Sequence, residues 1–220
     1  MLAAGARLVI LACSLLHGVG GAGLEATLIA VDNSGYMINS DHRPSRLQSQ
    51  YECVNLVCSV KTQNPENTVG LMAMGCQGDD DCPRVLVTPA TNQQVGPILI
   101  SMSSLNDQIG RAGANRVRFE KAMRTAYLSL KHRANKNQHP RIVAFVGRSG
   151  SVCVCLSMFA QLTCLTRTRV VAFVGSPLVG EDKNALVKWG KSLRKNNVAV
   201  DIISFGESPR LNTEVLQVTS

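Results

Sequence analysis

Strongly apolar strands alternate with amphipathic helices along most of this 220-residue chain. Strand signals lie at 26–31, 68–74, 84–88, 141–147 and 198–205, and helix signals lie at 44–58, 97–105, 119–133 and 181–195. Near-continuous apolar strands are typical of a mostly parallel sheet that is covered on both faces. The sequence therefore predicts an α/β fold of three layers, with a mostly parallel central sheet and helices on both faces.

The first predicted strand ends in a polar run, Asp32, Asn33 and Ser34, and Tyr36 follows closely. Open α/β sheets place their ligand crevice at the carboxyl ends of the strands, so these four residues form the candidate site. One interpretation is a cation site at Asp32 and Ser34. A hard cation needs a shell of several oxygens, however, and a phenol is a poor substitute for a short hydroxyl. The favoured interpretation is an edge that docks on a protein, with no metal bound.

Signatures of catalysis and cofactor binding are missing from the sequence. The segment 147–150 lacks the spacing of a nucleophile elbow, and no phosphate-cradling or dinucleotide motif follows a strand. The histidines at 17, 42, 132 and 139 fall in the leader, a loop, a helix end and a turn, without a convincing catalytic partner. We therefore expect no enzymatic activity and no cofactor.

The net charge of +8 is compatible with acidic partners, but aromatic residues make up only 4% of the chain. No block of lysines and arginines is interleaved with aromatic residues, so the sequence does not predict a nucleic-acid partner. The densest basic stretch, 131–141, closes a predicted helix. Cations at that position complement the helix dipole, which is a sufficient structural reason for them.

The eight cysteines do not form a disulfide framework. Cys53 and Cys58 share a predicted helix at a spacing that separates them around its axis. Cys76 and Cys82 bracket an acidic loop without a second Cys/His pair at zinc spacing. We expect reduced, unpaired thiols.

The first 22 residues resemble a leader. An early cation, Arg7, precedes an apolar run at 8–16 and then small residues at 18–23. This is the layout of a secretory signal peptide, and it is too short to span a membrane. The alternative is an extended start on an intracellular domain. We take 1–22 as a leader-like extension and 23–220 as one domain.

A short repeat interrupts this order. The segment 141–147 recurs at 169–175 with one difference, and the stretch between the copies is apolar and rich in cysteine. We expect 148–175 to be an inserted or duplicated segment, with one copy in the sheet and the other looped out. A binding hairpin is the alternative.

The run from Asp32 to Tyr36 resembles the D-x-S-x-S signature of von Willebrand factor A-type domains, with Tyr36 in place of the last serine. In that family the Asp and both hydroxyls hold a divalent cation that grips a partner's carboxylate. The family also uses a threonine on the next crevice loop, and 117–121 contains no hydroxyl. The resemblance thus implies the fold, with the metal site degenerate.

Further strings are similar to the A-domains of the ubiquitin-receptor subunits in the 26S proteasome regulatory particle. They lie at 24–27, 31–37, 44–50, 64–67, 69–71, 130–133, 173–177, 200–203, 205–207 and 212–214. The resemblance implies a non-catalytic subunit that docks between lid and base in ubiquitin-dependent protein degradation, in the cytoplasm and nucleus. It also implies contact with ubiquitinated proteins only indirectly, because no acidic ubiquitin-binding helix follows and the last elements of the domain are curtailed.

A secreted or surface adhesion domain is the rival hypothesis. It would use a cation at Asp32 and Ser34 and would explain the leader. It also predicts a complete ligand set and glycosylation sites, neither of which the sequence contains. Neither the docking-subunit hypothesis nor the adhesion hypothesis predicts a protein embedded in a membrane.

Overall fold

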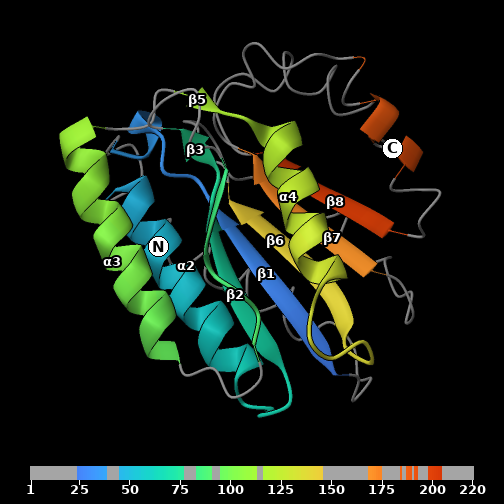
Figure 1. The fold of residues 1–220 in the computed structure, drawn as a ribbon. Helices are drawn as coiled ribbons and strands as arrows, with labels where there is room; N and C mark the ends of the chain where they lie inside the picture. Colours follow the sequence, from blue (N-terminus) through green and yellow to red (C-terminus); the bar gives the residue numbers. More distant parts are fainter. Residues whose placement is uncertain are drawn as a thin grey trace, which may run out of the picture.

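A six-stranded sheet forms the centre of the protein (Figure 1). The computed structural model describes residues 24–38, 45–76, 83–90, 95–112, 116–145, 168–174, 184, 187–189, 191–192 and 198–204. The strands are β1 (Glu25–Val31), β2 (Thr68–Ala73), β4 (Arg84–Val87), β6 (His139–Phe145), β7 (Thr168–Val174) and β8 (Val198–Ser204). Their order is β4-β2-β1-β6-β7-β8, and only the β2–β4 pair is antiparallel. The predicted mostly parallel sheet is confirmed.

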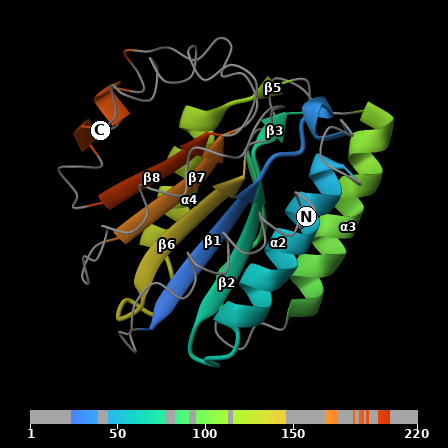
Figure 2. The same ribbon diagram turned by 180° about the vertical axis from the view of Figure 1, so that it is seen from behind.

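Helices cover both faces of the sheet. They are η1 (Gly35–Ile38), α2 (Arg46–Lys61), α3 (Val95–Ala112) and α4 (Phe119–Lys131), and a small ribbon pairs β3 (Gly75–Cys76) with β5 (Arg116–Val117). Buried residues of β1 alternate between two core clusters, so Leu28 packs with α4 and Ile29 packs with α2 and α3. Figure 2 shows α4 on the opposite side of the sheet from α2 and α3. The predicted three layers are therefore confirmed.

The boundaries of two helices differ from the prediction. Helix α2 begins at Arg46, because the Ser45 hydroxyl caps it by accepting the Gln48 N–H at 3.1 Å. Helix α3 runs from Val95 to Ala112, longer than the predicted 97–105. The sequence prediction stopped at Leu105 because the polar residues beyond it end the apolar stripe. Within the predicted helix at 181–195, the structure describes helical residues at 184, 187–189 and 191–192.

Both copies of the repeat are strands of the sheet, so the prediction that one copy is looped out is wrong. They form β6 and β7, which pair in parallel with Arg141 opposite Arg169 and Phe145 opposite Phe173. In a parallel pair in this register, equivalent side chains of the two strands point to the same face of the sheet. A duplicated strand can therefore lie beside its original with its buried residues on the correct faces. The intervening segment is long enough for a parallel crossover. Residues 146–167, which include most of the predicted insert, lie outside the described residues.

Amide hydrogen exchange tests this arrangement. Because β7 lies between β6 and β8, its amides have partners on both sides of the ladder. We expect comparable protection in 141–145 and 168–174, measured by mass spectrometry on peptides unique to each copy. Fast exchange in one copy alone would show that this copy is not in the sheet.

A cluster of charged and polar side chains lies at the end of the sheet where β1 begins. Glu25 accepts from Arg141 at 2.9 Å and pairs with Lys61 at the end of α2. The Glu25 N–H donates to the Asn67 side-chain oxygen at 2.8 Å, and the Asn67 amide donates to the Lys61 carbonyl at 3.1 Å. Burial lowers the pKa of Lys61, and the nearby Arg141 adds to this shift. This cluster therefore joins α2, β1 and β6 by charge.

The two thiols on α2 are buried. Cys53 and Cys58 form no disulfide, as the sequence predicted. Burial raises the pKa of the Cys58 thiol to about 12. A thiol that stays protonated in an apolar setting is a core residue with little reactivity. The predicted fate of Cys82, Cys153, Cys155 and Cys164 lies outside the described residues.

Candidate functional site

The predicted site lies at the carboxyl end of β1, at the same end of the molecule as the β3–β5 ribbon (Figure 1). We call residues 32–38 the strand-tip edge. Asp32 and Ser34 are 0% exposed and Asn33 is 6% exposed, so these three side chains face the interior. The three side chains therefore cannot touch a partner directly.

Asp32 is held by its own turn and by helix α2. Its carboxylate accepts the Ser34 N–H at 2.7 Å, which fixes the turn after β1. The buried Gln50 amide brackets the Asp32 backbone, accepting its N–H at 3.1 Å and donating to its carbonyl at 3.0 Å. Gln50 was missed from the sequence. The available signal was a polar residue between Leu47 and Val54 on the apolar face of a helix.

Asn33 attaches the small ribbon to the strand tip. Its side-chain oxygen accepts the Gly75 N–H at 2.6 Å, and its amide donates to the Gly75 carbonyl at 3.5 Å. Gly75 pairs with Val117 across the ribbon, so Asn33 also fixes the approach to α4. The Met74 N–H donates to the Val31 carbonyl at 3.0 Å, next to these bonds. We call the two bonds between Asn33 and Gly75 the Asn33 clamp.

Beyond Ser34 the chain turns outward into η1. The Ser34 carbonyl accepts the Met37 N–H at 3.1 Å, and Met37 is buried. Gly35 is exposed and Ile38 is 53% exposed, so the outer part of the strand-tip edge is apolar. The backbone of Tyr36 lies in η1, and its side chain lies outside the described part of the structure.

The residues at the tip do not fit a divalent cation. The Ser34 hydroxyl is buried without a hydrogen-bond partner among the described residues, but Asp32 already accepts from the Ser34 backbone. No group of three or more His, Cys, Asp or Glu residues gathers anywhere in the described ranges. The metal-free tip stays a prediction, which the small number of oxygen donors at the tip favours.

We expect the protein to be indifferent to divalent cations. Two oxygens do not close the shell that Mg²⁺ or Mn²⁺ requires, so neither ion should stabilise the folded state. The thermal unfolding midpoint, followed by circular dichroism, should stay the same in EDTA, MgCl₂ and MnCl₂. A midpoint that rises with Mn²⁺ concentration and falls back with EDTA would contradict this assignment.

Replacing Asn33 with alanine should lower the free energy of unfolding by about 1–3 kcal/mol, because it leaves the buried Gly75 N–H without its acceptor. Urea denaturation measures the loss. Asn33→Asp is the matched variant, since it keeps an acceptor for Gly75 while removing the donor. A loss in Asn33→Ala no larger than that of an exposed control such as Asn55→Ala would contradict the clamp.

Comparison with known proteins agrees with the fold. Residues 27–150 match the model of the von Willebrand factor type A domain. A 26S proteasome non-ATPase regulatory subunit 4 homolog from Oryza sativa is 43% identical over 88% of this chain and 38% of its own length. The 26S proteasome regulatory subunit rpn10 of Schizosaccharomyces pombe is 38% identical over 84% of this chain and 59% of its own length. The chain thus spans less than two thirds of either relative.

Solved structures show the same fold at low identity. The pilus adhesin SpaC from Lactobacillus rhamnosus GG superposes with a TM-score of 0.53 at 12% identity, over 91% of this chain and 28% of that one. The resemblance noted in the sequence is therefore confirmed at the level of both fold and relatives.

In the described ranges, no helix has the length and apolar character needed to cross a bilayer.

Proposed function

Because the chain belongs to the von Willebrand factor type A domain family, we propose that it is a non-catalytic docking module of the 26S proteasome regulatory particle. The observation that carries this proposal is the identity of 38–43% to proteins named as 26S proteasome regulatory subunits. Some relatives are named non-ATPase subunits, which agrees with the lack of a nucleophile–base pair in the sequence. Lid and base subunits are the proposed partners.

The strand-tip edge is the proposed contact surface. Asp32, Asn33 and Ser34 use their polar groups to fix the turn and the ribbon, so the edge is rigid before it meets a partner. Preorganisation of this kind lowers the ordering cost of association. Tyr36 and the exposed Ile38 then supply the contacts, with the buried triplet in a shaping role.

The remaining assignments belong to the same proposal. Residues 23–220 form the docking domain with 148–175 as a duplicated segment, and 1–22 form a leader-like extension. The protein acts in the cytoplasm and nucleus, and it meets ubiquitinated proteins through the particle. It takes part in ubiquitin-dependent protein degradation without binding a cofactor.

A pull-down of the full chain, tagged at its C-terminus and analysed by mass spectrometry, tests the docking function. We expect lid and base subunits together with a peptide from the intact N-terminus. Ile38→Asp should abolish recovery, because it places a charge in the contact surface. Ile100→Asp on α3 is the matched control, since Ile100 is 72% exposed and lies on another element.

Two outcomes of the pull-down would contradict the proposal or one part of it. A cleaved N-terminus with no proteasome subunits recovered would favour an exported adhesion domain and would overturn the proposal. Equal recovery with Ile38→Asp and with the unchanged chain would keep the particle as partner but remove the strand-tip edge as the contact.

A further inference from the structure

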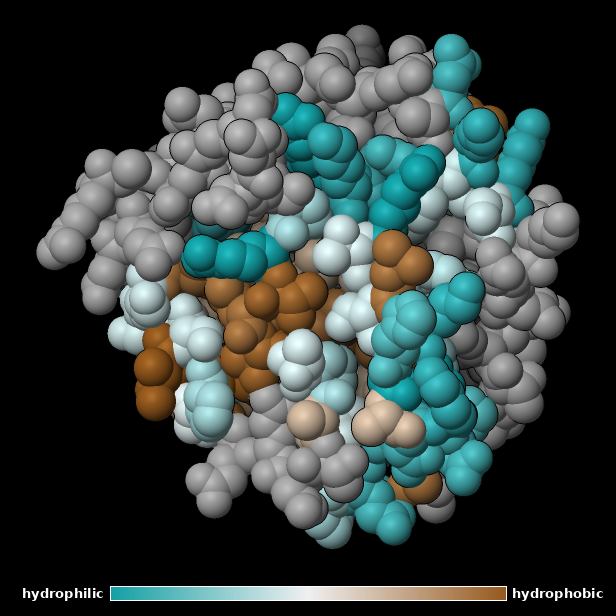
Figure 3. Space-filling view, viewed as in Figure 1, coloured by the Kyte–Doolittle hydropathy of each residue, from teal (hydrophilic) through white to brown (hydrophobic). Residues whose placement is uncertain are grey.

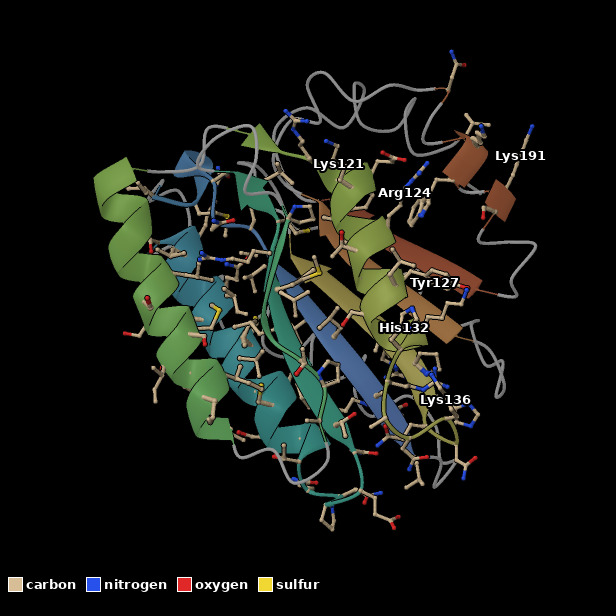
Figure 4. All side chains as sticks on the ribbon, in the orientation of Figure 1. Lys121, Arg124, Tyr127, His132, Lys136 and Lys191 are labelled. Carbon is tan, nitrogen blue, oxygen red and sulfur yellow. The ribbon has the colours of Figure 1, made fainter. Side chains whose placement is uncertain are left out.

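Helix α4 presents a basic outer face with an apolar centre. Its inner face is buried through Phe119, Met123, Ala126 and Leu130. Lys121, Arg124, Leu128 and Lys131 follow at spacings of three and four and are exposed, so they share one outer stripe. We call these four residues the α4 ridge. Figure 4 shows Lys121, Arg124, His132 and Lys136 projecting on this side of the molecule.

Within the described part of the chain, two of the three cations of the ridge, Lys121 and Lys131, have no carboxylate partner. Glu120 is the acidic residue of α4, and it is half-buried and paired with Arg124. From 121 to 141 the sequence contains no Asp or Glu. Neither Lys121 nor Lys131 forms an ion pair with any carboxylate of the described residues.

Helix capping explains only part of this charge. Arg133 donates to the Leu130 carbonyl at 3.0 Å, and Lys136 donates to the Lys131 carbonyl at 2.5 Å, so these two cations do complete the end of α4. Lys121 is different, because it lies in the first turn of the helix. A cation there opposes the helix dipole and lowers stability slightly. The dipole explanation therefore fails for Lys121.

The apolar centre of the ridge indicates a protein partner. Leu128 is 52% exposed between Arg124 and Lys131. Figure 3 shows a mostly hydrophilic surface over α4, with a small hydrophobic patch within it. Single-stranded nucleic acids are bound by exposed aromatic residues, and none of the described Phe, Tyr and Trp side chains is exposed, so Leu128 favours a protein partner. An apolar contact ringed by charge is the layout of a protein interface.

We propose that the α4 ridge is a second docking surface, which binds an acidic helical segment of a protein with one apolar residue between its carboxylates. Lys121 and Lys131 lie about 15 Å apart along the axis at 1.5 Å per residue, so a segment of about three turns spans them. This inference rests on the proposed docking function for the source of the segment, but its chemistry follows from the ridge itself. Charge complementarity selects and steers the partner, and the apolar contact holds it.

The probe is a fluorescein-labelled helical peptide with glutamates at both ends and a central leucine, titrated with the full chain. We expect binding that weakens with salt, and a dissociation constant that rises about tenfold in Lys121→Glu, Lys131→Glu and Leu128→Ser, consistent with loss of one well-placed contact. Arg84→Glu is the matched control, because Arg84 is exposed on β4 and carries the same charge change. Thermal unfolding of each variant verifies that it is folded.

Each outcome decides between distinct possibilities. An equal loss of peptide affinity in Arg84→Glu would mean that the peptide recognises only the net charge of the protein, and the ridge would be rejected. Tighter binding to single-stranded RNA or to phosphatidylserine vesicles than to the peptide would overturn the choice of a protein partner. If the unchanged chain recovers no proteasome subunit yet binds the peptide through the ridge, the docking function fails and the ridge stands. If the particle is recovered and ridge variants change neither assay, the ridge fails alone.

Discussion

Replacing Phe119 with alanine is expected to lower the free energy of unfolding by about 3–5 kcal/mol, the usual cost of removing a large aromatic side chain from a core. Phe119 is 0% exposed at the start of α4. It packs against β1 in the core cluster that also contains Leu28 and Met72, and its ring meets Trp189 edge-on at an interplanar angle of 84°. Its loss therefore loosens the contact between α4 and the sheet.

Urea denaturation measures the loss, and fluorescence locates it. Trp189 is the only tryptophan in the chain and is 5% exposed. Native Phe119→Ala should show red-shifted emission, because water reaches the indole. Leu128→Ala on the same helix is the control, since an exposed site should change the unfolding free energy by no more than about 0.5 kcal/mol. A small loss with unchanged emission would show that Phe119 and Trp189 are not packed together.

The layers and the parallel sheet could be predicted because strand and helix periodicities are local. The position of the second repeat copy could not, since pairing joins residues far apart in the chain. The sequence showed that 169–175 repeats the predicted strand at 141–147. It did not show that Ile142 pairs with Val170. That pairing is possible because equivalent side chains of the two copies point to the same face of the sheet.

The candidate site was found in part for the same reason. Asp32 to Ser34 follow a recognisable strand, so their place at the strand tip was predictable. Their partners Gln50 and Gly75 come from other elements, 18 and 42 positions away. The interior orientation of the triplet depends on those contacts. Sequence reasoning therefore located the edge and missed what holds it, and the docking role of the edge stays a prediction.

Replacing Glu25 with glutamine is expected to lower the free energy of unfolding by about 3 kcal/mol, the lower end of the cost of leaving buried charges uncompensated. Glu25 lies between two cations, with side-chain exposures of 8% for Lys61 and 18% for Arg141. Without the carboxylate, these cations repel each other across the start of β1. Glu66→Gln is the control, because Glu66 is exposed and its side chain forms no ion pair among the described residues.

The pH dependence separates this charge effect from a packing effect. The folded-state pKa of Lys61 lies below its ordinary value of 10.5, with burial as the main cause. Between those two values the unfolded chain binds more protons than the folded one, so Lys61 makes stability rise as the pH approaches 10.5. Removing Glu25 takes away the interactions that oppose this shift, so the rise should begin at lower pH in Glu25→Gln. It should be absent in Lys61→Met.

A double variant completes the test. If the loss in Glu25→Gln comes from uncompensated cations, adding Lys61→Met should recover part of it, because a buried apolar chain of similar length needs no counter-charge. Urea denaturation of the single and double variants, over the pH range below 10.5, gives the coupling between the two sites. Additive losses with no pH dependence would show that the Glu25 carboxylate and the Lys61 ammonium do not interact, and that the charge cluster does not join α2 to the sheet.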